Sequence, residues 1–434
     1  KCIKVRDDVN ALMMHKYIRD RGLDGHPLLG NQLVSMLVNV GSMKDACHVF
    51  NKLPHKEERS WHSLMSGYVR CGEPGLALAM YEKMKCEDDA LYSNPHSAAA
   101  LLKACAEMKD VQRGRRIHAD VEKKGLLQRY VVVGNAVINM YTKCHLLEKA
   151  REVFEQLPVR NVGSWNALIA GYAQNGLGDD ALRCLKQMQD MGVHPDPVTY
   201  ICILKACGSV RSLQIGEEID AEVRKQGLLQ KDVVLGTALV NMYSKCGALG
   251  KAQEVFELLP VQTVVSWNAL ITGYVYHECG HEALECFEHM RRFGISPNVI
   301  TYICILKACG IVGSLEMGGI IEIEVRKRGL LHKEVMLGNV LVDMYCKCGF
   351  LTKAQHLHNE LQFRSLASWN ALIGGYAQQG RSYEAFLCLE SMQREGFSPD
   401  QVTFICVLKS IKAIDEGKKI HDEICCRGLL ENNI

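Results

Sequence analysis

The sequence predicts an all-α protein, a solenoid of stacked helix-turn-helix repeats, and three observations support that prediction. A segment containing "SWNALI" recurs, with Trp165, Trp267 and Trp369 separated by 102 residues each time, and Trp61 lies 104 residues before the first. Apolar residues within each period follow helical spacing, and strand-like alternation is absent. Glycine-containing turns divide each period into short helices.

One period contains three related units, 162–196, 197–232 and 233–263, and each is expected to form a helical hairpin. In the first unit, helix A carries an apolar stripe at i, i+3, i+4 and i+7, formed by Trp165, Leu168, Ile169 and Tyr172. Asn175-Gly176 ends this helix, and helix B is expected from about Gly178 to Gly192. A single hairpin cannot bury its stripe, so successive hairpins must stack in one long array.

Composition narrows the class of protein and of partner. The chain has 434 residues, of which 48% are hydrophobic, so it can bury a core. A net charge of +2 gives no global basic field, and any surface for nucleic acid must therefore be local. No apolar run approaches the roughly 18 residues of a membrane helix, so no membrane association is predicted.

The chain contains 20 cysteines, and many of them follow the same period. The recurring series are Cys105, Cys207 and Cys309; Cys144, Cys246 and Cys348; and Cys184, Cys286 and Cys388. Equivalent small apolar sites in stacked repeats explain this regularity better than disulfides or metal ligands.

Tetratricopeptide repeats are also helical hairpins of similar length, but their Trp-x2-Leu-Gly-x2-Tyr pattern is not matched by "SWNALIAGYAQNG". This segment resembles instead the P unit of the pentatricopeptide repeat (PPR) family, in its land-plant PLS class. "VTYICILKACGSVRSLQIGEEI" resembles an L unit of that class, and "GTALVNMYSKCGALGKAQEVFELLP" an S unit. The resemblance covers essentially the whole chain and implies a right-handed superhelical solenoid.

The same register assigns a unit type to each part of the chain. The predicted units are 1–26 (partial L), 27–57 (S), 58–94 (P), 95–130 (L), 131–161 (S), 162–196 (P), 197–232 (L), 233–263 (S), 264–298 (P), 299–334 (L), 335–365 (S), 366–400 (P) and 401–434 (partial L). All belong to one predicted solenoid.

Asn166 follows Trp165 and is rotated about 100 degrees away from the apolar stripe, on a face with small alanines. An asparagine there could satisfy backbone N–H groups at the helix start, or present a donor and an acceptor to a base edge. Its recurrence beside a variable repeat-end residue favours base reading. The PPR resemblance implies that one helix A residue and the last residue of each unit together read one base of single-stranded RNA.

The predicted reader pairs are Asn31 with Glu57, His62 with Asn94, Asn135 with Asn161, Asn166 with Asp196, Thr237 with Thr263, Asn268 with Asn298, Asn339 with Ser365, and Asn370 with Asp400. The resemblance implies U for the two Asn-Asp pairs, C for Asn339 with Ser365, and a pyrimidine, C preferred, for the two Asn-Asn pairs. Thr237 implies a purine, and the first two pairs fit the code poorly. The L units place the apolar residues Ala99, Ile201, Ile303 and Ile405 at the reader position and are interpreted as spacers. The implied target is 5'-N-N-N-Y-U-N-R-Y-N-C-U-N-3'.

Two further sets of residues are expected to contact the RNA. The resemblance implies that residues just before the readers, Val132, Val234, Val265 and Met336, sandwich the base planes. Lysines on the A helices recur where they could neutralise phosphates, although a helix-dipole or solvated role is an equal alternative for each: Lys103, Lys143, Lys205, Lys245, Lys307, Lys347 and Lys409. The basic clusters near 123–124, 224–225 and 326–328 are assigned to the dipole of the B helices.

No catalytic set is predicted. PLS proteins often end in a cytidine deaminase domain, which needs His-x-Glu and Pro-Cys-x-x-Cys. "HDE" from His421 and "HNE" from His358 match only the first half, and no Cys-x-x-Cys occurs. "HECGHEALEC" at 277–286 and the Cys346-x-Cys348 pair are interpreted as ordinary repeat residues, so neither metal nor cofactor is expected.

The expected function is RNA binding that specifies an organellar C-to-U editing site in a plant, with catalysis by a deaminase domain absent from this chain, in cis or in trans. Editing accessory proteins are a further implied partner. The implied location is the mitochondrion or chloroplast, with no targeting segment in this chain. The alternatives are a splicing or transcript-stabilisation factor and a TPR-like protein scaffold.

Overall fold

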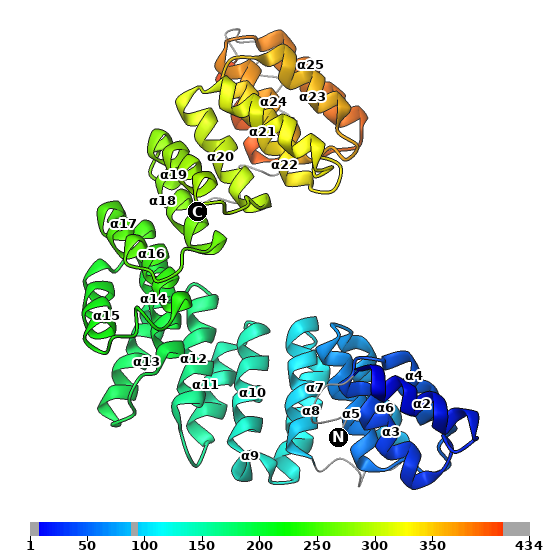
Figure 1. The fold of residues 1–434 in the computed structure, drawn as a ribbon. Coiled ribbons are helices and arrows are strands. Elements are labelled where there is room, and N and C mark those ends of the chain that lie inside the picture. Colours follow the sequence, from blue (N-terminus) through cyan, green and yellow to red (C-terminus); the bar gives the residue numbers. More distant parts are fainter. Residues whose placement is uncertain (1–7, 88–93, 411–434) are drawn as a thin grey trace. The chain divides into compact units, whose positions relative to one another are not determined.

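A computed structural model describes residues 8–87 and 94–410, and the regular secondary structure in those two ranges is α-helical throughout (Figure 1). The prediction of an all-α fold is confirmed. The predicted motif at His421 and the outer parts of units 1–26 and 401–434 lie outside these ranges, as do residues 88–93 of unit 58–94.

The helices alternate between two roles along the chain. The helices at the start of each predicted unit, the A helices, are α3 (Pro27–Asn39), α5 (Glu58–Arg70), α7 (Pro95–Met108), α10 (Val131–Lys143), α12 (Val162–Gln174), α14 (Pro197–Val210), α16 (Val233–Lys245), α18 (Val264–Tyr276), α20 (Val299–Val312), α22 (Val335–Lys347), α24 (Leu366–Gln378) and α26 (Gln401–Ser410).

The B helices are α2 (Asp8–Asp20), α4 (Met43–Lys52), α6 (Pro74–Glu87), α8 (Val111–Lys123), α11 (Leu147–Gln156), α13 (Gly178–Asp190), α15 (Leu213–Lys225), α17 (Leu249–Glu257), α19 (Gly280–Arg292), α21 (Leu315–Lys327), α23 (Leu351–Glu360) and α25 (Ser382–Arg394). One short helix, α9 (Leu126–Arg129), was not predicted.

The turn between helices A and B demands a left-handed residue. In the hairpin of α12 and α13, Gly176 takes φ +78°, as the Asn-Gly signal predicts. Lys109, His145, Arg211 and Glu278 occupy equivalent turns with φ between 54° and 62°. A non-glycine residue in this region is strained, so these four turns are costlier to form than the glycine turns.

The helices form two compact units, residues 1–210 and 211–434. Within the first, A helices contact the next A helix in the series α3, α5, α7, α10, α12 and α14. The B helices pack behind this layer; α13, for example, contacts both α12 and α14. The second unit repeats the plan, with the series α16, α18, α20, α22, α24 and α26.

The recurring tryptophan anchors each P hairpin to the preceding B helix. Trp165 is 2% exposed and meets Phe154 edge-on, with ring centroids 4.5 Å apart. Trp267 repeats this contact with Phe256 at 4.5 Å, whereas Trp369 meets His358 at 4.2 Å. This core contact explains the tryptophan of the recurring Trp-Asn pair.

The cysteines behave largely as small core residues. Cys105, Cys207 and Cys309 are fully buried, and the cysteines of the described ranges are free thiols. Burial raises the pKa of Cys105 and Cys309 to about 12, so these thiols stay protonated at neutral pH. Separately, none of the helices in residues 8–87 and 94–410 is long and apolar enough to cross a membrane.

Candidate nucleic-acid interface

The P-unit reader Asn166 is fixed by two partners. Its Nδ2 donates to Asp196 Oδ1 at 2.9 Å, and its Oδ1 accepts from the Thr199 hydroxyl at 2.6 Å. Asp196 also accepts from the Thr199 backbone N–H at 2.8 Å. The reader, the repeat-end residue and the third residue of the next A helix therefore form one hydrogen-bonded triad.

The same triad recurs in the other two predicted P units that have an asparagine at the reader position. Asn268 Nδ2 donates to Asn298 Oδ1 at 3.1 Å, and Thr301 donates to Asn268 Oδ1 at 2.7 Å. Asn370 Nδ2 donates to Asp400 Oδ1 at 3.1 Å, and Thr403 donates to Asn370 Oδ1 at 2.6 Å. The two hydrogen bonds set which way each amide faces.

The repeat-end residue, and not the reader asparagine, caps a helix. Asn298 accepts from the Thr301 backbone N–H at 3.0 Å at the start of α20, and Thr263 and Ser365 form capping boxes for α18 and α24. Asn166 lies in the body of α12, and its amide bonds to side chains. Capping therefore accounts for the repeat-end residues and leaves the reader asparagines unexplained.

The S-unit readers are held differently. Asn135 Oδ1 is buried and accepts no hydrogen bond from the described residues, because the Ser164 hydroxyl donates to Asn161 Oδ1 at 3.1 Å instead. In the unit 335–365, Ser365 itself donates to Asn339 Oδ1 at 2.9 Å. In these pairs the reader and the repeat end are 26 positions apart in the sequence, against 30 in the predicted P units.

The remaining S-unit pairs are less suited to reading. Asn31 is 3% exposed; its Nδ2 donates to the Pro27 carbonyl at 2.7 Å, and its Oδ1 accepts from Ser60 at 2.6 Å. The Thr237 hydroxyl donates to the Val233 carbonyl at 2.7 Å, and no hydrogen bond between described atoms joins it to Thr263. Asn31 Oδ1 also accepts from the Glu57 backbone N–H at 3.2 Å, whereas the Thr237 hydroxyl is bonded within its own helix.

The residues expected to sandwich bases are exposed apolar side chains. Val132, Val234, Val265 and Met336 are 46–64% exposed, an unusual state for residues of the second helical position. The sequence reasoning missed the L-unit counterparts Val198, Ile300 and Val402, which are 52–56% exposed. Their shared second position in helix A was the available signal. At this position the P units 162–196 and 366–400 have Gly163 and Ala367.

The L-unit positions interpreted as spacers bring no polar group to this face. Ala99, Ile201 and Ile303 are half-buried and Ile405 is 45% exposed. One helical turn further, the phosphate candidates Lys103, Lys205, Lys307 and Lys409 are exposed. The lysines therefore lie on the same helix face as the reader positions.

Most of the lysine candidates are uncommitted. Lys347 pairs with Asp343 at 2.8 Å, and Lys103 approaches Glu107 at 3.9 Å. In residues 8–87 and 94–410 no ion pair involves the other candidates, Lys143, Lys205, Lys245, Lys307 and Lys409. By contrast, Arg224 and Arg326 at the ends of B helices pair with Asp220 and Glu322, both at 2.9 Å, and have a structural role.

The repeat-end carboxylates Asp196 and Asp400 are ionised. Burial acts to raise the pKa of Asp196, but the hydrogen bonds from Thr199 and Asn166 outweigh it and hold the pKa below the usual aspartate value. The pKa of Asp400 is lowered for the same reasons by Thr403 and Asn370. Both carboxylates are therefore acceptors at neutral pH.

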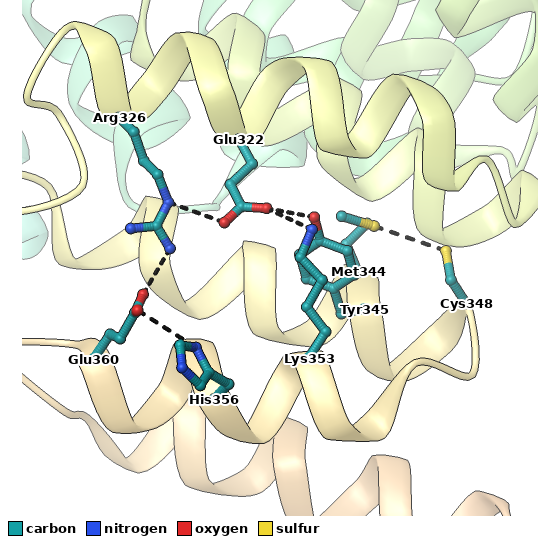
Figure 2. Close-up of polar contacts among 8 residues, drawn as sticks. All are labelled: Glu322, Arg326, Met344, Tyr345, Cys348, Lys353, His356 and Glu360. Atoms are coloured by element: carbon teal, nitrogen blue, oxygen red, sulfur yellow. Dashed lines mark hydrogen bonds and ion pairs between the residues drawn. The ribbon is translucent and has the colours of Figure 1, made fainter.

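A buried ionic network joins α21, α22 and α23 on the side of the B helices. Glu322 of α21 is 7% exposed and accepts from Tyr345 at 2.5 Å, from Lys353 at 3.0 Å and from Arg326 at 2.9 Å, as Figure 2 shows. Arg326 continues to Glu360 at 2.7 Å, which also meets His356. Asp220 makes the equivalent contacts with Tyr243 and Arg224. Glu322 and Glu360 therefore each have a cationic partner within the network.

The motifs considered for metal binding have local explanations. His277 Nε2 donates to the Ser244 carbonyl at 2.8 Å, and Cys279 lies at the start of α19. His358 is fully buried against Trp369. Within the described residues no three His, Cys, Asp or Glu side chains gather as a metal site.

Comparison with known proteins places these observations in a family. Residues 160–209, 262–310 and 364–411 match the profile described as the PPR repeat family, and residues 59–88, 135–162, 237–261 and 339–366 match that of the PPR repeat. The chain is 32% identical over 417 residues to the pentatricopeptide repeat-containing protein At1g11290, chloroplastic, of Arabidopsis thaliana, covering 95% of this chain and 51% of that protein.

A second Arabidopsis thaliana relative, At3g09040, mitochondrial, is 33% identical over 95% of this chain and 40% of its own length. The chain thus spans about half the length of these relatives. Among solved structures, maize PPR10 matches with a TM-score of 0.66 and 17% identity, over 98% of this chain and 67% of that one. PPR10 in complex with an 18-nt psaJ RNA element matches with a TM-score of 0.76 and 19% identity, over 93% and 61%.

Proposed function

The chain belongs to the pentatricopeptide repeat family, and from that premise we propose that it binds single-stranded RNA and reads bases through its reader pairs. The observation that carries the proposal is the recurring triad of reader, repeat-end residue and hydroxyl. A relative in fold, PPR10, binds an RNA element. The triad supplies a physical reason why different pairs would select different bases.

The Asn166–Asp196 pair complements uracil. Two hydrogen bonds end on Asp196 Oδ1, from Asn166 and from the Thr199 backbone, and Oδ2 is left to accept from a ligand. Asn166 Nδ2 retains a second N–H. One acceptor beside one donor matches the N3–H of uracil and a neighbouring carbonyl. Asn370 with Asp400 repeats this arrangement.

The Asn268–Asn298 pair offers two donors instead. Asn298 Oδ1 accepts the backbone N–H of Thr301, so its Nδ2 takes the place of the free carboxylate oxygen. Two donors match the bare N3 and the O2 of cytosine, whereas the N3–H of uracil would oppose an N–H. In unit 335–365 the Ser365 hydroxyl is used to bond Asn339, and the Asn339 Nδ2 donors again favour cytosine.

The exposed apolar residues and lysines complete the proposed binding surface. Aliphatic side chains at the second helix position would cover the base planes, and uncommitted lysines would neutralise phosphates, which makes affinity salt-dependent. The lengths of the predicted units resemble those of the PLS class. We propose that the bound RNA specifies an organellar C-to-U editing site, with the deaminase supplied in cis or in trans. Splicing or transcript stabilisation is the alternative output.

The experiment is equilibrium binding, at fixed salt, of the chain to a twelve-nucleotide RNA with the implied pyrimidine pattern. The comparison RNA replaces the uracils opposite Asn166 and Asn370 by adenine. The matched RNA should bind at least about tenfold tighter, because each mismatch loses its paired hydrogen bonds at ~1 kcal/mol or more. The double variant Asn166→Thr and Asn370→Thr should move the preference from U towards G.

Equal binding of the two RNAs, or no binding, would contradict base reading. Absence of RNA binding together with capture of a peptide partner would favour the TPR-like scaffold instead.

A further inference from the structure

One cavity, beside the predicted reader pair His62 and Asn94, differs from the other predicted reader sites. Its volume is about 490 Å³, and it lies between α5 and α7 in the unit whose reader pair fits the code poorly. The residues that matter for its chemistry are Arg59, His62, Arg70, Asn94, His96 and Ser97. All of them belong to the described residues.

Two buried polar groups in this lining have no partner among the described residues. His62 is 7% exposed, and its Nδ1 makes no hydrogen bond; Ser97 is fully buried, and its hydroxyl makes none. Buried polar groups are normally hydrogen-bonded, so two unpaired groups in one lining point to a ligand that satisfies them. Ser97 holds the position of Thr199, whose hydroxyl is occupied by its reader.

The tautomer of His62 follows from its other nitrogen. His62 Nε2 donates a hydrogen bond to the Glu58 carboxylate at 2.9 Å. Burial lowers the pKa of His62 more than the Glu58 contact raises it, so the ring is neutral at neutral pH. Nδ1 is then a hydrogen-bond acceptor on a side chain that lines the cavity.

Asn94 contributes a donor from the other side. Its Oδ1 accepts from the backbone N–H groups of His96 at 2.8 Å and Ser97 at 3.4 Å, so its Nδ2 is left to donate. No hydrogen bond between described atoms joins Asn94 to His62, in contrast to the 2.9 Å bond of Asn166 to Asp196. The space that those bonded pairs close is therefore open here.

The second helix positions beside this site also differ from those elsewhere. Where most other A helices have Val or Ile, α5 has Arg59 and α7 has His96, and both side chains are exposed. Guanidinium and imidazole planes stack on bases, and the larger π surface of a purine gains more from them. Arg70, also exposed, adds positive charge for a phosphate.

We propose that this cavity binds a purine nucleotide of the RNA, with His62 Nδ1 accepting from a base N–H, Asn94 Nδ2 donating to a base acceptor, and Arg59 and His96 stacking on the base. This rests on the proposed function and names the base class at the second nucleotide of the twelve, which the pair code leaves open. Ser97 can donate or accept, so adenine and guanine both fit.

The test measures binding of the wild-type chain to five twelve-nucleotide RNAs that differ only at the second nucleotide: A, G, C, U or an abasic site. A and G should bind about five- to tenfold tighter than C and U, the range expected from stacking. Pyrimidines binding equally or better would overturn the assignment. Uracil preference at the fifth nucleotide is measured in parallel; its loss would refute base reading as a whole, whereas its retention isolates failure to the cavity.

Two variants sharpen the test. Arg59→Val changes an exposed residue to the one found at sister positions and should remove at least half of the purine advantage, with the fifth-nucleotide preference intact. His62→Asn restores a reader able to bond both Asn94 and Ser97 and should switch the preference to pyrimidine. Persistence of the full purine preference in both variants would overturn the proposal.

Discussion

The readers Asn166 and Asn135 occupy the same position of an A helix in neighbouring units, yet their surroundings differ. Asn166 has its amide oxygen bonded to Thr199 and its nitrogen to Asp196. Asn135 has a buried amide oxygen without a partner among the described residues, because Ser164 bonds to Asn161. Asn166 and Asn135 thus differ in whether the amide oxygen is held by a hydroxyl before RNA arrives.

Removing the two readers should have unequal effects. Asn166→Ala takes away an organised donor and leaves Thr199 and Asp196 misaligned, so affinity for RNA with U at the fifth nucleotide should fall about tenfold, or ~1.4 kcal/mol. Asn135→Ala should cost about twofold, since an unheld amide must be ordered on binding. Equilibrium titration at one salt concentration measures both. Equal losses would break the comparison.

The hydroxyl of Thr199 should influence which base is preferred at the fifth nucleotide. Thr199→Val keeps the shape of the side chain but removes the bond to Asn166, and the U-over-C preference at the fifth nucleotide should fall about fivefold. Thr199→Ser should restore it.

Ser266→Ala is the matched control, because Ser266 closes a capping box with Thr263 and makes no hydrogen bond to Asn166 or Asp196. It should lower stability slightly and leave the fifth-nucleotide preference within about twofold. If Ser266→Ala has the same effect on preference as Thr199→Val, Thr199 acts through the helix cap alone.

A change at His358 should alter the stability of the protein without altering its base preference. His358 packs against Trp369 as Phe154 packs against Trp165. Burial, with a smaller effect of Arg364, lowers the pKa of His358 to about 4, from an ordinary value near 6.5. The unfolded chain therefore binds more protons between those values, and stability falls as pH drops through that window. His358→Phe should raise the free energy of unfolding by about 1–2 kcal/mol at pH 5. At pH 7.5 little of this pH-dependent gain should remain.

Urea unfolding at the two pH values measures this, with Phe154→His as the reciprocal variant that should introduce acid sensitivity. Base preference opposite Asn339 and Asn370 should not move in the His358 variant. A gain independent of pH would show that packing, and not protonation, distinguishes the two hairpins.

Much of the fold followed from the sequence because its signals are local. The stripe from Trp165, the Asn175-Gly176 break and Gly192 predicted α12 and α13 closely, since helical period and turn residues act within a few positions. The stacking of hairpins followed from the need to bury each stripe. The short helix α9 was missed, because its four residues carry no period.

The positions of the proposed reader residues could be predicted from the sequence, but their hydrogen-bond partners could not. Recurrence singled out the proposed reader asparagines, yet it did not indicate the contacts of Thr199, Thr301 and Thr403, because the partner of each hydroxyl is a side chain 33 positions away. The contacts of Glu322 were missed for the same reason. A buried acid looks like a surface acid in a helical pattern until its three donors are placed around it.

The most direct measurement of the central claim is the base preference of Asp196→Asn at the fifth nucleotide, by titration with U and C versions of the same RNA. The variant keeps the cap on α14 and exchanges the free carboxylate oxygen for an amide N–H, as in Asn298. The account predicts that the preference reverses from U to C. An unchanged preference for U, with the thermal midpoint also unchanged, would contradict it.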